Sequence, residues 1–402
     1  MMAPGGAGAP GGDASAPSLS RYLESLPAYP LSQIPEIRRE LEGRGIQVLD
    51  LGTGDADLTP PPQAVEALQL AVADPGFSRY PFQLGLPAFR EAVVEWMAER
   101  FGVELDPYRE ILPLIGSKEG LAHLAFTVLS PGDAAMFPDP GYRAYLGGIV
   151  LAGGVPRPAP LLPEHDFRVP LEPLEGAAGD DVRLLYLNYP GNPTGATVEL
   201  AELQRAVDIC RSRGIVLAHD AAYSEIAFDG YRPPSVLQAH GARDVALEFH
   251  SLSKTYNMTG WRLGWAAGSA RLIAALSRVK TFLDTGAFLG VQAGGTAALK
   301  CHADWVPRNV AQFQLRRDAA VEALRRGGYT VEWPRGGLYL WVPIPTGESS
   351  EAFALRALEQ EGVVVLPGSG LGEAGEGFFR VALTLPPSGM EEAGGRLGRL
   401  LG

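Results

Sequence analysis

The residues best suited to chemistry fall in one short stretch, Ser251-Leu-Ser253-Lys254, which Arg262 follows in the sequence Gly-Trp-Arg-Leu-Gly. A lysine that follows a buried strand is shielded from solvent, so the pKa of its amine can fall and the amine can attack an aldehyde. The two serine hydroxyls and the arginine supply donors for a phosphate dianion. A lone lysine would more often lie in a polar surface turn, but this spacing favours a site that holds a phosphorylated aldehyde on Lys254.

A second candidate group is Asp220 and Tyr223, in the sequence His-Asp-Ala-Ala-Tyr. An aspartate at the carboxyl end of a buried strand can stay ionised and keep a pyridinium nitrogen protonated, which is the electron-sink arrangement that pyridoxal phosphate needs. Tyr223 could donate a hydrogen bond to the phenolic oxygen of such a ring. Taken alone, Asp220 is more often a turn or helix-cap residue. We assign no chemistry to His219.

Two further segments carry polar loops after predicted strands. Asn192 precedes Pro193 and is held extended, which can aim its amide at a ligand, although a plain proline turn is an equal alternative. Gly116-Ser117-Lys118 opens a helix, so free N–H groups and the Ser117 hydroxyl can bind an anion such as the phosphate. The alternative for Ser117 is an ordinary helix N-cap. Lys118 could turn to the phosphate, to a substrate carboxylate or to solvent.

Two more residues are candidates because of their surroundings. Tyr142 follows Asp-Pro-Gly and could stack on a planar ring, although an exposed loop tyrosine is more common. Arg380 interrupts an apolar strand-like run, Phe-Phe-Arg-Val-Ala. Burying an arginine without a partner is costly, so a substrate carboxylate is a reasonable partner, with an internal salt bridge as the equal alternative.

The chain between residues 46 and 268 supplies a scaffold that can bring these loops together. Short apolar runs alternate there with helix-like stretches, which predicts an α/β fold with a mainly parallel sheet and helices on both faces. Ligands bind beyond the carboxyl ends of the strands in such sheets, where Ser117, Asn192, Asp220 and Lys254 fall. The expected strand runs are 111–115, 134–137, 182–187, 215–219, 245–250 and 263–267.

The C-terminal part has a different pattern. Helical spacing over 271–282 and 291–324 precedes strand-like runs, which predicts a second, smaller α+β domain. These strand-like runs are 339–342, 363–366 and 378–383. The expected division is a disordered tail at 1–18, a segment at 19–49 that packs with the small domain, a large domain at 50–285 and the small domain at 286–402.

One glycine motif is set aside. The sequence from Gly370 to Gly375 matches the G-x-G-x-x-G pattern of dinucleotide-binding proteins. That pattern must open a helix, and here a strand-like run follows instead. We therefore expect a Gly-rich connector, which removes the basis for a nicotinamide oxidoreductase.

Composition limits the class of partner. The 402 residues are 46% hydrophobic and 20% charged, with a formal net charge of −12, so no basic face for nucleic acid is expected. No run of about 18 apolar residues is present to span a membrane. Cys210, Cys301 and six scattered histidines have no recognised metal-ligand spacing, so we expect no metal site. A reducing cytoplasm fits this cysteine content best.

Taken together, these segments resemble the class I and II aminotransferases of fold type I, which use pyridoxal 5'-phosphate, over nearly the whole chain after about residue 20. The resemblance implies a mainly parallel seven-stranded sheet between helices, a smaller α+β domain, and a homodimer with shared active sites. More narrowly, the chain resembles bacterial-type LL-diaminopimelate aminotransferases, which implies a role in lysine biosynthesis. The stretches that carry this narrower resemblance are 51–61, 114–120, 188–196, 219–226, 248–268 and 376–384.

The resemblance also implies a role for each matching residue. Lys254 would hold the cofactor and move the proton, while Asp220 would pair with the ring nitrogen. Tyr223 and Asn192 would bind the phenolic oxygen, and Tyr142 would stack on the ring. The residues implied at the phosphate are Ser117, Ser251, Ser253, Arg262 and the main chain of Lys118, with Tyr80 and Thr285 acting at the neighbouring subunit's site. The residues implied at the substrate are Arg380, Gly54, Tyr29, Asn192 and Lys118.

Three positions depart from the family pattern. Arg143 stands where proline usually follows the stacking tyrosine, Thr285 replaces serine or asparagine, and Gly336-Gly337 replaces bulkier residues. These changes lie near the substrate side and leave the exact amino acid open.

We therefore expect an enzyme that moves an amino group between a dicarboxylic or diaminopimelate-like amino acid and a 2-oxo acid such as 2-oxoglutarate. The alternatives are a C–S lyase with the same cofactor and a broad-specificity aspartate/alanine-type aminotransferase. A non-enzymatic regulator with this fold would need an additional DNA-binding domain.

Overall fold

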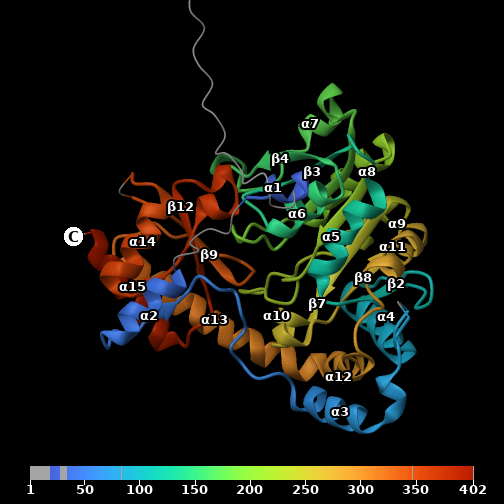
Figure 1. Ribbon diagram of the computed structural model, residues 1–402, viewed down its shortest axis with the longest axis horizontal. Coiled ribbons are helices and arrows are strands. Elements are labelled where there is room, and N and C mark those ends of the chain that lie inside the picture. Colours follow the sequence, from blue (N-terminus) through green and yellow to red (C-terminus); the bar gives the residue numbers. More distant parts are fainter. Residues whose placement is uncertain (1–18, 28–33, 83, 346, 402) are drawn as a thin grey trace, which may run out of the picture.

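The computed structural model describes residues 19–27, 34–82, 84–345 and 347–401. A seven-stranded sheet forms the centre of its larger body (Figure 1). The strand order is β2 (Ile111–Leu114), β8 (Gly264–Gly268), β7 (Ala246–Ser251), β6 (Val216–Asp220), β5 (Val182–Asn188), β3 (Ala134–Asp139) and β4 (Val155–Pro160). Neighbouring strands from β7 to β4 are parallel, whereas β8 runs antiparallel to β7 and β2. The predicted mainly parallel seven-stranded sheet is confirmed.

Helices cover both faces of this sheet because both faces are apolar. Leu184 and Tyr186 of β5 pack against helices on one face, and the intervening Leu185 and Leu187 pack on the other. This alternation turns each strand into a continuous apolar run, as the sequence suggested. The first face holds α5 (Ser117–Val128), α6 (Arg143–Leu151) and α11 (Ala270–Leu283), and the second holds α4 (Pro87–Phe101) and α8 (Leu200–Arg213).

The sequence analysis missed β4, whose sequence Val-Pro-Arg-Pro-Ala-Pro contains three prolines. Proline cannot donate a hydrogen bond within a sheet, so such a sequence argues against a central strand. β4 lies at the edge of the sheet and pairs only with β3, which is the position where proline is tolerated.

A smaller body lies beside the larger one. Its three-stranded antiparallel sheet has the order β11 (Leu366–Pro367), β12 (Phe378–Ala382), β9 (Tyr339–Pro343). The helices around it are α13 (His302–Arg326), α14 (Ser350–Glu361) and α15 (Pro387–Gly398). The expectation of one strand at 363–366 is wrong, because the chain changes sheets within it: β10 (Val363–Val364) pairs with β1 (Leu49–Asp50), and β11 pairs with β12.

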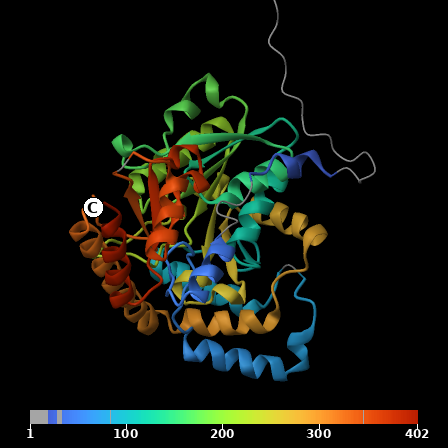
Figure 2. The ribbon, with the colours of Figure 1, turned by 60° about the vertical axis from the view of Figure 1, so that its left-hand side comes forward.

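Two segments connect the bodies. The helix α2 (Ile34–Gly43) packs on α14 through Leu41 and Leu358, whereas α1 (Arg21–Glu24) contacts α6 of the larger body. The helix α12 (Leu289–Lys300) lies beside α3 (Pro62–Ala73), as Figures 1 and 2 show, and α13 continues from it after Cys301 to pack on α15. The domain division after residue 285 stays a prediction, and the tail at 1–18 lies outside the described residues.

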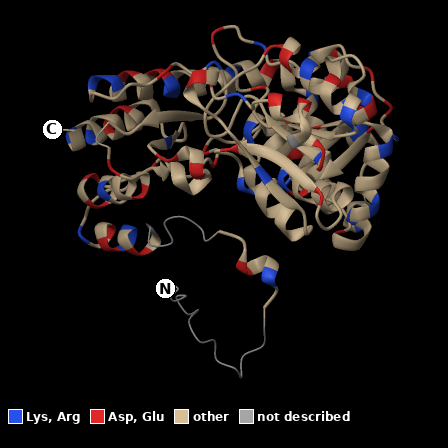
Figure 3. Cartoon of the chain, turned by 90° about the horizontal axis from the view of Figure 1, so that it is seen from above, with Lys and Arg blue, Asp and Glu red and all other residues tan. Residues whose placement is uncertain are grey.

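The remaining elements are short. The helices are α7 (Glu172–Glu175), α9 (Ala242–Val245) and α10 (Leu252–Thr255), and the 3₁₀ turns are Pro75–Ser78, Pro163–His165, Ala177–Gly179, Val236–Gln238, Thr259–Trp261, Gly368–Leu371, Glu373–Gly375 and Arg399–Leu401. Within the described ranges, none of the helices has both the length and the apolar character needed to cross a membrane. Acidic and basic residues are interspersed over both bodies (Figure 3).

Candidate active site

The loops after β2, β3, β5, β6 and β7 open into one cavity of about 610 Å³, which residues of the smaller body close from the other side. This is the strand edge at which the sequence analysis expected a ligand. The cavity brings together most of the predicted site residues. They are Gly54, Ser117, Lys118, Tyr142, Asn192, Asp220, Tyr223, Ser251, Ser253, Lys254, Arg262 and Arg380.

Two of the predicted residues that the structure describes do not line this cavity. Tyr80 is 70% exposed on the surface, and Thr285 lies half-buried in the loop after α11. Both were expected to act at the site of a neighbouring subunit, which a single chain does not test. Tyr29 lies outside the described residues.

Asp220 is the last residue of β6 and is only 4% exposed. Its Oδ2 accepts a hydrogen bond from the Tyr145 hydroxyl at 2.7 Å, and its Oδ1 accepts one from the Ala222 N–H at 3.2 Å. The Ala222 contact is the turn interaction that the sequence analysis gave as the alternative role of Asp220. Asp220 therefore makes a turn contact and also lines the cavity. Burial raises the pKa of Asp220, and these two hydrogen bonds oppose that rise. A cationic ligand in the cavity would stabilise the buried carboxylate.

Behind Asp220, Glu248 of β7 lies fully buried between two histidines. His219 Nδ1 and His250 Nε2 lie 2.9 and 2.8 Å from its carboxylate oxygens, and the Val236 N–H donates to it at 2.7 Å. Burial alone would raise the pKa of Glu248, but the hydrogen bonds from the histidines hold it well below its ordinary value. The electrostatic interaction of Asp220 with His219 and His250 also opposes the rise in the pKa of Asp220.

Lys254 sits in the short helix α10, which follows β7 directly. Its ammonium donates a hydrogen bond to the Gly54 carbonyl oxygen at 2.5 Å. Burial lowers the pKa of Lys254, as expected from its position, while Tyr339 and Asp55 oppose that effect. A Cβ at Gly54 would lie 2.0 Å from the Tyr339 hydroxyl, so only glycine fits beside the amine.

The start of α5 has the features of an anion site. Ser117 is the first helical residue, and no side chain caps the helix, so the interpretation of Ser117 as an ordinary N-cap is wrong. The N-cap is Gly116, which has φ +73° and lies so close to Arg262 that a Cβ would approach its Nη2 to 2.4 Å. The missing Cβ leaves room for the guanidinium beside the helix N-terminus, and Arg262 Nη1 donates to the Thr259 carbonyl at 2.8 Å. Ser251 completes this end of the cavity, although its hydroxyl also caps α10 by accepting from the Ser253 N–H.

Aromatic side chains line the cavity beside Asp220. The Tyr142 ring packs edge-on against Tyr145 with centroids 5.8 Å apart, and the Lys118 ammonium lies 5.9 Å from the Tyr142 centroid. The hydroxyls of Tyr223 and Tyr339 lie 3.2 Å apart, and burial raises the pKa of Tyr223 far above its ordinary value. The Tyr223 phenol therefore stays protonated and can donate a hydrogen bond.

Arg380 has no carboxylate partner among the described residues, although it is only 6% exposed. Its Nη1 donates to Asn192 Oδ1 at 2.9 Å and its Nη2 to the Gly52 carbonyl at 2.7 Å, while its guanidinium lies over the Tyr339 ring. Its buried Nε has no hydrogen-bond partner. The internal salt bridge offered as the alternative is therefore wrong. A buried guanidinium of this kind is suited to a ligand carboxylate.

The sequence analysis missed Tyr145, Tyr339 and Asp55. Tyr145 lies in an amphipathic helix and Tyr339 begins a predicted strand, so both looked like core residues. Asp55 directly follows Gly54 in a loop rich in small residues, and its side chain lines the cavity. The sequence signal that could have identified Asp55 as a site residue was its position next to Gly54, which was already predicted at the substrate.

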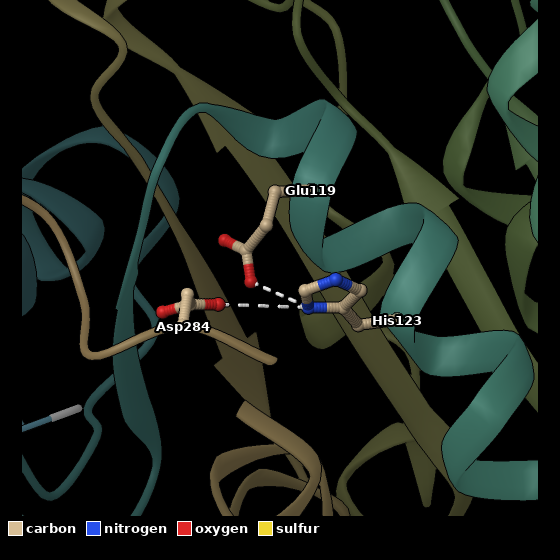
Figure 4. Close-up of side chains that lie close together, drawn as sticks. All are labelled: Glu119, His123 and Asp284. Carbon is tan, nitrogen blue, oxygen red and sulfur yellow. Dashed lines mark ion pairs between the residues drawn. The ribbon is translucent and has the colours of Figure 1, made fainter. Parts of the chain in front are cut away.

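A separate group, Glu119, His123 and Asp284, has potential ligand atoms within 4.8 Å of one another (Figure 4). The fully buried Lys280 already lies among them, with its ammonium 2.6 Å from Glu119 Oε1 and 3.0 Å from Asp284 Oδ1. This cation takes the place that a metal ion would need. The group ties α5 to the end of α11, and Glu119 Oε2 also accepts from the Ile115 N–H before the anion site.

Comparison with known proteins identifies the family of this chain. The family described as "Aminotransferase class I and II" matches residues 46–397. The chain belongs to this family. The aminotransferase is 46% identical to an LL-diaminopimelate aminotransferase of Desulforudis audaxviator over 95% of this chain and 98% of that protein. It moves an amino group between an amino acid and a 2-oxo acid, and is a pyridoxal-phosphate-dependent enzyme.

Two solved structures are similar over almost their whole length. Substrate-bound BacF of Bacillus subtilis is 32% identical with a TM-score of 0.90, covering 96% of this aminotransferase and 98% of that chain. A probable N-succinyldiaminopimelate aminotransferase of Thermus thermophilus is 36% identical with a TM-score of 0.87, covering 91% and 98% respectively.

The cavity fits pyridoxal phosphate. The uncapped α5 N-terminus and Arg262 match a phosphate, because both offer donors and positive charge. The buried Asp220 carboxylate, which forms no ion pair with a described Lys or Arg side chain, matches a protonated ring nitrogen. Lys254 lies in the same cavity, so an amine is available for the aldehyde.

Proposed function

We propose that this aminotransferase acts on LL-diaminopimelate or a closely similar dicarboxylic amino acid, with a 2-oxo acid such as 2-oxoglutarate as acceptor. Arg380 carries the proposal: its guanidinium is buried, has an unpartnered Nε and forms no ion pair with a described carboxylate. Such a group suits the α-carboxylate of an amino acid. The choice of amino acid is supported by the 46% identity to the Desulforudis audaxviator protein of that name.

The proposed cofactor contacts follow the chemistry of each lining group. Ser117, Ser251, Ser253, Arg262 and the N–H groups at the start of α5 hold the phosphate. Asp220 would pair with the ring nitrogen, Tyr142 would contact the ring, and Tyr223 with Asn192 would bind the phenolic oxygen. Pyridoxal phosphate, when bound, supplies an electron sink for the negative charge that develops at the substrate Cα.

Lys254 carries the proton in this scheme. Because burial lowers the pKa of its amine, a larger fraction is neutral and able to take a proton at neutral pH. The Gly54 carbonyl oxygen, which accepts from this amine, sets its direction. Asp220 keeps its charge in a buried environment, where its interaction with a ring cation is strong.

We also infer a homodimer in which Tyr80 and Thr285 act across the interface. Large apolar side chains are exposed on α3, in the segments at 80–82 and 84–86, at the end of α11 and just before α12. These side chains are Leu70, Val72, Phe82, Leu84, Phe282, Leu283 and Phe288. Gln292 of α12 anchors the segment at 84–86 by accepting from the Leu86 N–H at 2.7 Å. Exposed apolar groups of this extent support a protein interface. Sedimentation of the holoenzyme tests it, and a monomer at working concentration would contradict it.

The experiment that tests the function measures the half-reaction of the holoenzyme with single amino acids. Loss of the cofactor absorption band is recorded for LL-diaminopimelate, glutamate, aspartate, alanine and cystathionine, without a 2-oxo acid. We expect LL-diaminopimelate to react fastest and to form no pyruvate or ammonia. Release of pyruvate and ammonia from cystathionine would instead favour the C–S lyase, and equal rates for aspartate and alanine the broad-specificity enzyme.

Reduction with a hydride reagent tests the attachment residue independently of substrate. We expect the yellow colour to be bleached and the cofactor to be retained covalently on Lys254, as peptide mapping would show. A covalent adduct on Lys118, Lys280 or Lys300 would contradict the assignment.

A further inference from the structure

The segment at 52–57, which follows β1, gives carbonyl oxygens to two cations of the site. The Gly52 carbonyl accepts from Arg380 Nη2 at 2.7 Å, and the Gly54 carbonyl accepts from the Lys254 ammonium. Three consecutive residues therefore contact both the group proposed for the α-carboxylate and the group proposed to carry the proton. A shift of this segment would move the acceptors of both cations.

Backbone pairing does not fix this segment beyond its start. The N–H groups of Gly52 and Thr53 donate to the Asp50 carboxylate. From Gly54 to Leu58, by contrast, no backbone group forms a hydrogen bond with another backbone group of the described residues. A stretch without such pairing keeps one conformation only where side chains anchor it. The position of the Gly54 carbonyl therefore depends on side-chain contacts.

Arg316 of α13 supplies such an anchor through Asp57. Its Nη1 and Nη2 donate to the two Asp57 carboxylate oxygens at 2.6 and 2.9 Å, the parallel arrangement that gives an arginine–carboxylate pair its directionality. Arg316 is only 4% exposed. Its Nη1 also donates to the carbonyl of Leu383, three residues after Arg380, at 3.2 Å. One guanidinium thus joins the Gly54 segment to the end of the strand that carries Arg380.

The same helix holds the segment that carries Lys254. Asn309 lies seven residues before Arg316 and so on the same side of α13. Its Nδ2 donates to the Thr255 carbonyl at 3.1 Å, and its Oδ1 accepts from Asn257 Nδ2 at 2.9 Å. From there α13 continues into the smaller body (Figure 1). It is therefore a common support for the amine and for the carbonyl that accepts from it.

We propose that Arg316 is a positioning residue of the reaction: its ion pair with Asp57 holds the Gly54 carbonyl in place. Through that carbonyl Arg316 sets the direction of the Lys254 amine, and through the end of β12 it supports Arg380. Arg316 is not among the described residues that line the cavity, so it acts through these groups and contacts no reacting atom. The inference rests on the roles proposed for Lys254 and Arg380.

The neighbouring Arg317 offers a matched control. It lies on the same helix, is 3% exposed and forms a two-point ion pair with Asp229. Its hydrogen-bond partners, Asp229, Asp318 and Pro334, do not line the cavity. Arg316 and Arg317 are therefore alike in burial, charge and pairing, and they differ in whether their partners reach the site.

The test compares Arg316→Met with Arg317→Met in the holoenzyme, at a temperature where scanning calorimetry shows both to be folded. The half-reaction is followed at saturating concentration of the amino acid that reacts fastest with the wild type. We expect Arg316→Met to slow it by about tenfold to a hundredfold, because a displacement of about 1 Å can cost about a hundredfold in rate. Arg317→Met should leave the rate unchanged although it also loses a buried ion pair.

Binding of hexanoate, an unreactive monocarboxylate, reports on Arg380 without catalysis. Titration calorimetry of the holoenzyme should show weaker binding in Arg316→Met by about twofold to tenfold, the effect of one misaligned hydrogen bond. Arg317→Met should bind hexanoate as the wild type does. A loss of stability alone would not separate the two variants in this way.

A double-mutant cycle tests whether Arg316 acts through Asp57. Asp57→Asn should slow the half-reaction by a factor similar to that of Arg316→Met, and the double variant should be little slower than either, because each change removes the same pair. Arg316→Lys keeps the charge but loses the two-point geometry, so its rate should lie between those of the wild type and Arg316→Met. If Arg316→Met does not fold, Arg316→Lys and Asp57→Asn carry the test, since the Asp57 side chain is 41% exposed.

The outcomes separate this inference from the proposed function. Wild-type rates in the Arg316 and Asp57 variants, equal slowing in Arg317→Met, or fully additive effects in the cycle would each overturn the positioning role. If Lys254→Ala retains turnover, the role proposed for Lys254 fails. If Lys254→Ala is inactive while the Arg316 variants react normally, only the Arg316 assignment fails.

Discussion

Replacing Asp220 tests whether its charge or its hydrogen bonds matter. Asp220→Asn removes the negative charge but keeps a side chain that can accept from the Tyr145 hydroxyl, now 2.7 Å from Oδ2. Asp220→Ala removes both. If the carboxylate keeps a cofactor ring nitrogen protonated, the two variants should lose activity to a similar extent, because both lack the counter-charge.

The size of the loss follows from the burial of Asp220. Surface ion pairs contribute about 0–1 kcal/mol, but breaking a buried pair costs about 3–5 kcal/mol. Since Asp220 is 4% exposed, the buried figure applies. At about 1.4 kcal/mol per tenfold change, the half-reaction should slow by about two to four orders of magnitude.

The assay is the single-turnover loss of cofactor absorption at saturating amino acid, with circular dichroism as the control for folding. Near wild-type rates in Asp220→Asn would refute the charge argument, and near wild-type rates in both variants would leave Asp220 as a turn residue. A rate retained in Asp220→Asn but lost in Asp220→Ala would show that the role of Asp220 is to orient the Tyr145 hydroxyl.

In the cofactor-free protein, removing the Asp220 charge should raise stability, whereas in the holoenzyme it should lower activity. Burial raises the pKa of Asp220 above its ordinary value of 3.8, so the folded state holds this proton more tightly than the unfolded state. The free energy of unfolding therefore falls as the pH rises from 3.8 through the raised pKa, and the full cost applies above that raised pKa. Asp220→Asn should raise the thermal midpoint of the cofactor-free protein at pH 7, and this gain should disappear at a pH below 3.8, as scanning calorimetry can measure.

Three other substitutions test the Lys254 amine, the anion site at the start of α5 and the buried ion pairs of Lys280. Lys254→Ala should retain cofactor binding, measured by equilibrium dialysis, yet lose transamination by several orders of magnitude, because the amine that attaches the cofactor and moves the proton is gone; retained turnover would exclude that role. Gly116→Ala should weaken cofactor binding because its Cβ would come within 2.4 Å of Arg262, whereas Gly132→Ala, also at positive φ but with open space around it, should not; equal effects would point to backbone strain alone. Lys280→Met should lower the free energy of unfolding by about 3–5 kcal/mol, because it leaves Glu119 and Asp284 without their buried cation; adding Glu119→Gln should restore part of this, and a denaturant titration that shows no loss would contradict the ion-pair interpretation.

Six strands of the large sheet were predictable because each of them is buried on both faces and reads as an apolar run, whereas β4 is partly exposed. The polar residue at the end of each run then located the cavity. The edge strand β4 could not be found this way, because three prolines in six residues argue against a strand unless it lies at an edge, and edge position is a property of the sheet. The change of sheet within 363–366 depends likewise on the distant partners Leu49 and Arg380.

Site residues with a local motif were found, and those without one were missed. Asp220 ends the buried strand β6, and Lys254 lies in α10 directly after the buried strand β7. Residue type and sequence position therefore both identify them as site candidates. Tyr339 and Tyr145 read as core residues because an aromatic ring that lines a cavity has the same sequence context as one in a core. The uncapped N-terminus of α5 also needed coordinates, since Ser117 has the residue type of an N-cap but occupies the next position.

The contact between Arg380 and the Gly52 carbonyl joins positions 328 residues apart, which has a consequence for biosynthesis of the enzyme. A growing chain folds from its N-terminal part onward, so β6, which carries Asp220, and α10, which carries Lys254, can form while residue 380 has not yet been made. Until β12 arrives, the half-built cavity is open on one side, and its lining of tyrosines and cations is accessible to chaperones and to cofactor alike. Once released from the ribosome, chains truncated before β12 and the full-length chain should therefore differ sharply in their ability to retain a carboxylate ligand.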